Sequence, residues 1–414
     1  MQAANRITEL IHFDVIIKRR GISNMLDQTA ISQIKATIRK SVVNNEVAGA
    51  NFMVIKNGEE VFYHEDGLAD RESGRRISRD TIFRLYSMTK PVTATAVMIL
   101  VERGEIDLFD SVSQYLPGFK NQKFERDGEL VPVEREMNIH DLLDMTCGLV
   151  YGGSHAAGQA TEALFREIGA RLLGDEPLGT VDAMNRLGEG PLAFQPGTSW
   201  AYGTSADVLG AVVEVVSGMR FGEFLQKEMF GPLGMLDTGF WLPEEKRARL
   251  VNSYATETDG MSLFTGNHLG IIHQMDRNPA FESGGAGLVS TIDDAAKFTT
   301  MLLNKGSLNG VQILRPRTVE YLTSGTLNAR QQLAFENWHT LAGHSYGNLM
   351  RVMVDTTTAG ILASPGEYGW DGWLGVYFAN FPAEDLTILV MIQKKDAGTI
   401  PLTRKLRNIV LSTL

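Results

Sequence analysis

Apolar residues near the start of the chain follow first a helical period and then a strand-like one. Over residues 27–46 they recur every three or four positions, which predicts an amphipathic helix. The residues that set this period are Ile31, Ile34, Ile38 and Val42. Residues 50–66 instead contain two runs of β-branched and aromatic residues around Asn57-Gly58, a dipeptide that favours a tight turn. A helix followed by a β-hairpin is therefore expected.

The middle of the chain shows the helical period in several segments. We expect helices over residues 87–103, 138–146, 205–217, 221–230 and 292–304. Because proline is tolerated in the first turn of a helix and damaging deeper in, Pro91 places the start of the first of these near Ser87. Thr291 is the expected N-cap of the last, which carries two aspartates in its first turn.

The last third of the chain turns to strands. Residues 376–378 and 386–390 are β-forming runs on either side of a five-residue loop, which predicts a hairpin. A helix over residues 401–413 is expected to close the chain. Strands at both ends and helices between them are typical of an α+β protein whose antiparallel sheet draws on both ends of the chain.

Composition and charge exclude some classes of function. The 414 residues are 43% apolar and 21% charged, close to the average of soluble globular proteins. The net charge of −10 argues against nucleic-acid binding, which needs a basic stripe to displace counterions. No apolar run reaches the ~20 residues that a membrane span requires. A soluble protein of two domains, or of one large composite domain, is expected.

The N-terminus and the single cysteine bear on the cellular location. A basic cluster, residues 18–20, follows an apolar stretch, residues 10–17, whereas a secretory signal has the reverse order. We therefore expect a cytoplasmic protein with an N-terminal extension, residues 1–26. Cys147 allows no intramolecular disulfide and is expected to be a small buried residue.

The commonest catalytic motifs are absent, and one short motif stands out. The sequence has no Gly-x-Ser-x-Gly, no His-Glu-x-x-His and no Gly-x-Gly-x-x-Gly, so neither a metal nor a cofactor is expected. Ser87 and Lys90 form a Ser-x-x-Lys, and helical positions three apart share one face, so the amine can reach the hydroxyl. A partly buried lysine loses some of its ~10.4 pKa and can accept a proton. A second copy, from Ser32 to Lys35, is expected to be a solvated helix face.

Six segments resemble serine hydrolases of the β-lactamase and penicillin-binding-protein fold, most closely the family VIII carboxylesterases that are similar to class C β-lactamases. They are Phe83 to Pro91, Ile139 to Leu149, Pro196 to Thr204, Pro232 to Met235, Ser283 to Leu288 and Gly366 to Trp373. The resemblance covers about residues 27–412 and implies an antiparallel sheet flanked by terminal helices, plus a mainly helical region. It places the α/β part at about 27–85 and 284–412, and the helical part at about 86–283.

The resemblance implies roles for the first two motifs. Tyr202, in Tyr202-Gly203-Thr204, occupies the place of the catalytic tyrosine, which is coupled to Lys90 and takes the proton of the nucleophile Ser87. A nearby ammonium favours the phenolate of a tyrosine, which is otherwise a poor base at neutral pH. Thr204 replaces the asparagine of β-lactamases and is expected to contact substrate. A core tyrosine with a satisfied hydroxyl is the alternative for Tyr202.

The third motif is Trp370-Asp371-Gly372. Relatives carry Lys-Thr-Gly or His-x-Gly in β-lactamases and peptidases, and Trp-Gly-Gly in many family VIII esterases. The cation that would bind a substrate carboxylate is missing, which favours carboxylic esters. The resemblance implies that these three residues contact substrate and that the backbone N–H groups of Ser87 and Trp373 form the oxyanion hole. An aromatic-rich core strand is the alternative.

The expected protein is a serine hydrolase that forms an acyl-enzyme on Ser87, with a small-molecule ester as its substrate and no cofactor. Three other functions stay open at this point. They are a β-lactamase or D-amino-acid peptidase, an acyltransferase of the same fold, and a non-catalytic relative used for binding or assembly. The residues carry no signal for the oligomeric state.

Overall fold

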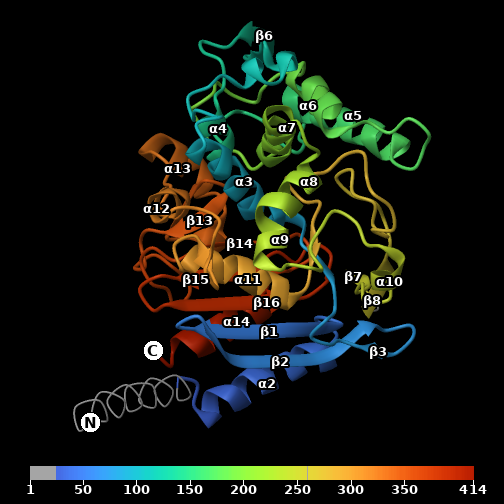
Figure 1. Ribbon diagram of the computed structural model, residues 1–414, viewed down its shortest axis with the longest axis vertical. Helices are drawn as coiled ribbons and strands as arrows, with labels where there is room; N and C mark the ends of the chain where they lie inside the picture. Colours follow the sequence, from blue (N-terminus) through green and yellow to red (C-terminus); the bar gives the residue numbers. More distant parts are fainter. Residues whose placement is uncertain (1–24, 259) are drawn as a thin grey trace, which may run out of the picture.

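An eight-stranded antiparallel sheet forms the centre of the protein (Figure 1), in the order β12-β13-β14-β15-β16-β1-β2-β3. The computed structural model describes residues 25–258 and 260–414, so nearly all of the expected extension, residues 1–26, lies outside the described part. The strands are β1 (Gly49–Lys56), β2 (Glu59–Asp70), β3 (Arg75–Arg76), β12 (His344–Gly347), β13 (Met350–Met353), β14 (Tyr368–Asp371), β15 (Tyr377–Phe381) and β16 (Leu386–Met391). Because β1 pairs with β16, the two ends of the chain meet in one sheet, as expected.

The two terminal helices cover one face of this sheet. Phe52 and Val54 of β1 belong to a buried cluster with α2 (Gln28–Val43) and α14 (Pro401–Leu411). The alternate residue Met53 belongs to the core on the other side. Successive side chains of a strand point to opposite faces of the sheet. Both faces of this sheet are therefore covered. The expected fold, a sheet flanked by terminal helices beside a helical region, is confirmed.

The helical region lies against the opposite face (Figure 1). There α11 (Ile292–Leu303) contacts β16, β15 and β1 directly. The other helices are α3 (Lys90–Glu102), α4 (Ile139–Leu143), α5 (Ala156–Arg171), α6 (Thr180–Gly188), α7 (Ser205–Ser217), α8 (Phe221–Leu225), α9 (Gly231–Leu233), α10 (Glu244–Arg247), α12 (Pro316–Thr323) and α13 (Ala329–Phe335). A separate hairpin, β7 (Ser253–Glu257) and β8 (Gly260–Phe264), lies beside them.

Local sequence signals set several element boundaries. Thr291 caps α11 by accepting from the Asp294 N–H, as expected. The Asn57-Gly58 turn joins β1 to β2 with positive φ at both residues, which is the reason for the preference for Asn-Gly there. The helix expected from Ser87 begins as a regular α-helix only at Lys90, because residues 86–89 form a tighter 3₁₀ turn.

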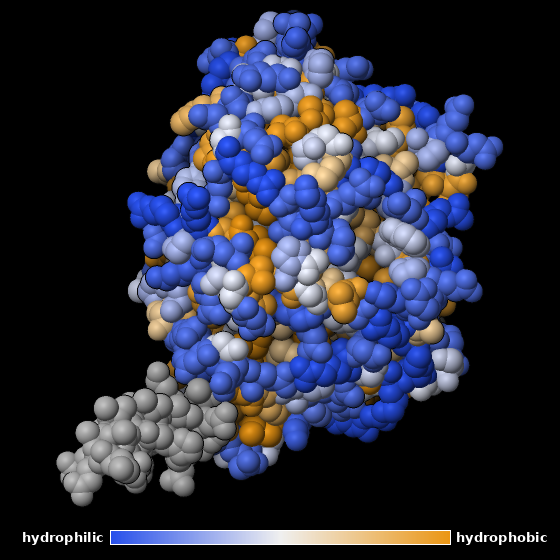
Figure 2. All heavy atoms as spheres, viewed as in Figure 1, coloured by the Kyte–Doolittle hydropathy of each residue, from blue (hydrophilic) through white to orange (hydrophobic). Residues whose placement is uncertain are grey.

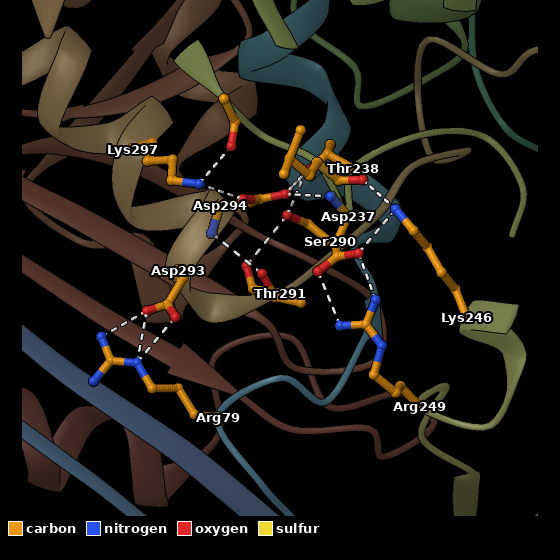
Figure 3. A network of polar contacts seen from close by, with 12 residues as sticks. Arg79, Asp237, Thr238, Lys246, Arg249, Ser290, Thr291, Asp293, Asp294 and Lys297 are labelled. Atoms are coloured by element: carbon orange, nitrogen blue, oxygen red, sulfur yellow. Dashed lines mark hydrogen bonds and ion pairs between the residues drawn. The ribbon is translucent and has the colours of Figure 1, made fainter. Parts of the chain in front are cut away.

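A network of polar contacts fixes the N-terminus of α11 (Figure 3). The buried Asp294 carboxylate accepts from the Asp237 N–H at 2.7 Å, the Thr238 hydroxyl at 3.1 Å and the Lys297 ammonium at 2.9 Å. Thr238 also contacts Ser290 at 2.8 Å. The network therefore holds the chain directly after Ser283 to Leu288, one of the segments that resemble the family.

The surface is largely hydrophilic, and the single cysteine is buried. Hydrophilic side chains predominate on the face drawn in Figure 2, with apolar side chains visible between them. Within residues 25–258 and 260–414, no helix combines the length and apolar character needed to cross a membrane. Cys147 is buried, as expected, and burial raises the pKa of its thiol to about 11.

Candidate active site

Ser87 lies in the 3₁₀ turn Tyr86–Thr89, directly before α3. Tyr86 has φ +44°, a left-handed conformation that is unfavourable for a bulky side chain. Strain of this kind concentrates at functional sites, where the surrounding structure has to hold it in place. The Leu85 N–H donates to the Leu288 carbonyl at 2.8 Å and so anchors the turn. Ser87 itself is half-buried and lines a cavity.

Lys90 is fully buried and contacts the serine. Its Nζ lies 3.0 Å from Ser87 Oγ, 3.0 Å from the Tyr151 hydroxyl and 2.8 Å from the Gly285 carbonyl oxygen. Burial disfavours the ammonium and lowers the pKa of Lys90 to about 7, although the charges of Asp207 and Asp371 act in the opposite direction. A substantial fraction of Lys90 is therefore a neutral amine near neutral pH.

Tyr202 completes the expected trio of side chains. Lys90 Nζ lies 4.7 Å from the centre of its ring, and the Trp370 indole N–H donates to its hydroxyl at 3.0 Å. Burial raises the pKa of Tyr202, while hydrogen bonding from Ser87 and Trp370 opposes this rise. The structure thus brings Ser87, Lys90 and Tyr202 together, with Tyr202 as a neutral phenol.

Tyr151 is a member of the site that the sequence did not reveal. Its hydroxyl accepts from Lys90, and its ring lies 5.7 Å from that of Tyr202. Burial raises the pKa of Tyr151 well above its usual value, so it too is a neutral phenol. Its one sequence signal is its place two residues after Leu149, the end of a segment that resembles the family.

The third motif reaches the site at the end of β14. Trp370 is buried, and Asp371 is half-buried in the cavity wall, where its Oδ2 accepts from the Thr399 hydroxyl. Burial raises the pKa of Asp371, opposed by Arg351, Thr399 and Lys90. Gly372 packs so closely on the turn before Ser87 that a Cβ would lie 2.2 Å from the Leu85 carbonyl oxygen. Only glycine allows this approach.

Two backbone N–H groups at the site have no acceptor within the part of the chain that the structure describes. They are the N–H groups of Ser87 and Trp373, neither of which donates to another described residue. The Trp373 side chain is fixed by its indole N–H, which donates to Asp396 Oδ1 at 2.6 Å, and by stacking on His268. Free N–H groups beside a nucleophile can stabilise a developing oxyanion.

A cavity of about 940 Å³ opens onto Ser87. Part of its wall is aromatic, from Tyr151, Phe165, Tyr202, Trp338, Trp370 and Trp373, and charged side chains such as Glu162 and Arg166 also line it. Arg351 also lines it, but its guanidinium lies over the Tyr377 ring and donates to the Phe378 carbonyl. The aromatic part of the wall suits an apolar group next to the serine hydroxyl.

Thr204 lies elsewhere than expected. It is the fully buried N-cap residue of α7 and is absent from the described residues that line the cavity.

Within residues 25–258 and 260–414, no group of three or more His, Cys, Asp or Glu side chains is placed to hold a metal ion.

Comparison with known proteins places this geometry in a family. The Beta-lactamase family model matches residues 34–409, and the chain belongs to this family. It is similar to esterase EstB of Burkholderia gladioli, with 31% identity over 93% of this chain and 98% of that protein. Protein Rv1367c of Mycobacterium tuberculosis is 31% identical over 87% of this chain and 89% of its own. Among solved structures, EstCE1, a hydrolase with promiscuous acyltransferase activity, superposes with a TM-score of 0.78 at 24% identity, covering 93% of this chain and 99% of its own.

The family and the fold define the class of the protein. It is an enzyme of the serine hydrolase type built on the β-lactamase fold, as expected from the sequence.

Proposed function

We propose that this protein is a carboxylesterase that cleaves small acyl esters through an acyl-enzyme on Ser87. The observation that carries the proposal is the contact between Lys90 Nζ and Ser87 Oγ at 3.0 Å, made by a fully buried lysine whose pKa is lowered to about 7. A neutral amine in hydrogen-bonding reach of a serine hydroxyl can act as its general base.

The first proton transfer is assigned to Lys90 rather than to Tyr202. Burial lowers the pKa of the lysine and raises that of the tyrosine, so the amine is the better base near neutral pH. As Ser87 Oγ attacks the ester carbonyl carbon, its proton moves to Lys90 Nζ. The Tyr202 hydroxyl, polarised by the Trp370 N–H, passes a proton to the departing alkoxide, and the alcohol leaves.

The carbonyl oxygen becomes negative during the attack. The Ser87 and Trp373 N–H groups, which have no acceptor among residues 25–258 and 260–414, can donate to it. The Lys90 ammonium then gives its proton to the Tyr202 phenolate, so both groups return to their neutral forms. In the second half of the cycle a water molecule gives a proton to the Lys90 amine as its oxygen attacks the acyl carbon. The bond between the acyl carbon and Ser87 Oγ then breaks, Ser87 takes the proton of the Lys90 ammonium, and the carboxylic acid leaves.

Three features favour a neutral ester over a β-lactam or a peptide with a free carboxylate. The third motif has neither lysine nor histidine to bind a carboxylate. The indole N–H of its Trp370 already donates to the Tyr202 hydroxyl. Of the two arginines among the described residues that line the cavity, Arg351 is engaged with protein groups and Arg166 lies 3.8 Å from the Glu162 carboxylate. EstB, which is similar over almost its full length, is named an esterase.

The direct test combines a probe with a substrate comparison. A fluorophosphonate probe is expected to label the protein, with the added mass on the peptide that contains Ser87. Turnover of p-nitrophenyl acetate and butyrate is expected to exceed that of a chromogenic cephalosporin. Equal turnover of both would support a β-lactamase or D-amino-acid peptidase. Transfer to an added alcohol faster than hydrolysis would indicate an acyltransferase, and no labelling of folded protein would favour a non-catalytic relative.

Gly372→Ala tests the placement of the Trp373 N–H. The new Cβ would collide with the Leu85 carbonyl oxygen. The third motif would therefore have to move away from the turn that holds Ser87. Because losing one oxyanion donor typically costs 10²–10³-fold, we expect kcat for p-nitrophenyl acetate to fall by about 10²-fold. Gly360→Ala is the matched control, since nothing lies within 4 Å of its Cβ position. Equal activity of the two variants would contradict this placement.

A further inference from the structure

A buried carboxylate lies behind Lys90 and has no part in the steps above. Asp207 belongs to the first turn of α7 and is 1% exposed. Its Oδ1 accepts from the Ser283 hydroxyl at 2.5 Å and from the Gly285 N–H at 3.0 Å. Burial raises the pKa of Asp207, whereas these two hydrogen bonds and the charge of Lys90 oppose the rise and favour the ionised form. Burying a negative charge costs free energy unless the charge is hydrogen-bonded or lies near a cation.

Gly285 connects this carboxylate to the lysine. Its N–H donates to Asp207, and its carbonyl oxygen accepts from Lys90 Nζ at 2.8 Å. The contact depends on glycine, because a Cβ there would lie 2.8 Å from Asp207 Oδ2 and 3.1 Å from the Tyr151 hydroxyl. The same loop is held a second time, where the Thr93 hydroxyl donates to the Gly284 carbonyl at 2.6 Å.

The groups that face Lys90 determine how readily it keeps its proton. Ser87 and Tyr151 contact its nitrogen, and the Tyr202 ring lies beside it, but all three are neutral. Two carboxylates act on it through their charge, and Asp207 has the larger effect, ahead of Asp371. Asp207 is therefore the main counter-charge to the Lys90 ammonium.

We propose that Asp207 is a positioning residue that sets the pH at which Lys90 releases its proton, by fixing the Gly285 carbonyl against Nζ and by placing its carboxylate on the other side of that peptide group. This inference rests on the proposed function, because Lys90 has to be neutral to accept the Ser87 proton. In the cycle, the carboxylate stabilises the ammonium that forms when Ser87 attacks.

Asp207→Asn separates charge from shape. The amide oxygen of asparagine can still accept from Ser283 and from the Gly285 N–H, so the loop stays in place while the charge is lost. In the wild type, kcat/KM for p-nitrophenyl acetate is expected to rise with pH through about 7, as Lys90 becomes neutral. Without the neighbouring anion the ammonium is less stable, so this rising limb is expected to move about one unit lower in pH, as opposite charges shift a pKa by about 1–3 units.

Ser283→Ala is the matched control. It removes a hydrogen bond to the same carboxylate but keeps the charge, so its rising limb is expected to stay within a few tenths of a unit of the wild type. Asp207→Ser gives the same readout as Asp207→Asn if the asparagine variant does not fold. An active, labelled Asp207→Asn or Asp207→Ser enzyme whose limb stays at the wild-type pH overturns this inference alone. A wild-type protein that no fluorophosphonate labels overturns the proposed function as well.

Discussion

Ser87→Ala is expected to lower kcat/KM for p-nitrophenyl acetate by at least about 10⁴-fold, because no other group can form the acyl-enzyme. The variant should fold normally, since Ser87 is half-buried and the partners of its hydroxyl are two side chains of the site, Lys90 and Tyr202. Fluorophosphonate labelling should disappear together with turnover. Kinetics with the ester, labelling and a thermal denaturation curve check all three points.

The chain provides its own control for this variant. Ser32 and Lys35 form the second Ser-x-x-Lys, on an exposed face of α2, where the Ser32 hydroxyl donates to the Gln28 carbonyl. Ser32→Ala should therefore leave turnover and labelling unchanged. If Ser32→Ala lost activity and Ser87→Ala kept it, the assignment of the nucleophile would be wrong.

A double variant shows whether Ser87 and Lys90 act as a unit. Lys90→Met alone should lower kcat/KM by about 10²–10⁴-fold, the usual contribution of a general base. Without the Ser87 hydroxyl, Lys90 has no proton to accept. The double variant Ser87→Ala with Lys90→Met should therefore be no less active than Ser87→Ala alone. Losses that multiply would mean that the two residues act independently.

Local signals were enough to predict much of the fold. The Asn57-Gly58 turn, the Thr291 cap and the position of Pro91 depend on a few neighbouring residues, and the structure places each element close to where these signals put it. The strands β1 and β16 were also predictable as strands, from runs of β-branched and aromatic residues. Their pairing followed from the family resemblance and the outline of the chain.

The parts of the site that escaped prediction are set by tertiary packing. Tyr151 reaches Lys90 across 61 positions of sequence, and no periodicity marks such a contact. Asp207 looks like an ordinary acidic residue in the first turn of a helix, and its burial becomes visible only once the Gly284-Gly285 loop lies against it. The direction of Asp371 depends on Thr399, which lies 28 positions further along the chain.

A second buried charge cluster holds the sheet to the C-terminal helix. Glu367, directly before β14, is fully buried and accepts two hydrogen bonds from the Arg407 guanidinium of α14. Arg351 lies 3.9 Å away on the neighbouring strand, and His344 lies at the same distance. One carboxylate thus balances two buried guanidinium groups, and no residue of this cluster takes part in the proposed reaction.

Glu367→Gln is therefore expected to be strongly destabilising. It leaves Arg407 and Arg351 without their counter-charge, and breaking a buried ion pair typically costs about 3–5 kcal/mol of the free energy of unfolding. Arg407→Met should cost less, because Glu367 then keeps Arg351 as a partner. The exposed pair Arg317–Glu320 supplies the control, since Glu320→Gln should cost at most about 1 kcal/mol. Urea denaturation midpoints rank the three variants, and a Glu367→Gln midpoint equal to that of Glu320→Gln would contradict the argument.

The same carboxylate makes the stability depend on pH. Burial alone would raise the pKa of Glu367, but the nearby His344 and Arg407 outweigh this and bring it to about 2, below its ordinary value of 4.5. A carboxyl group with a lowered pKa in the folded state stabilises the fold fully above its unfolded pKa, and this contribution is lost as the pH falls through the folded one. The wild type should thus lose stability between pH 4.5 and about 2 more steeply than Glu367→Gln, which has no proton to bind at this position. Parallel curves for the two proteins over this interval, measured by denaturation at stepwise lower pH, would show that Glu367 is not the group responsible.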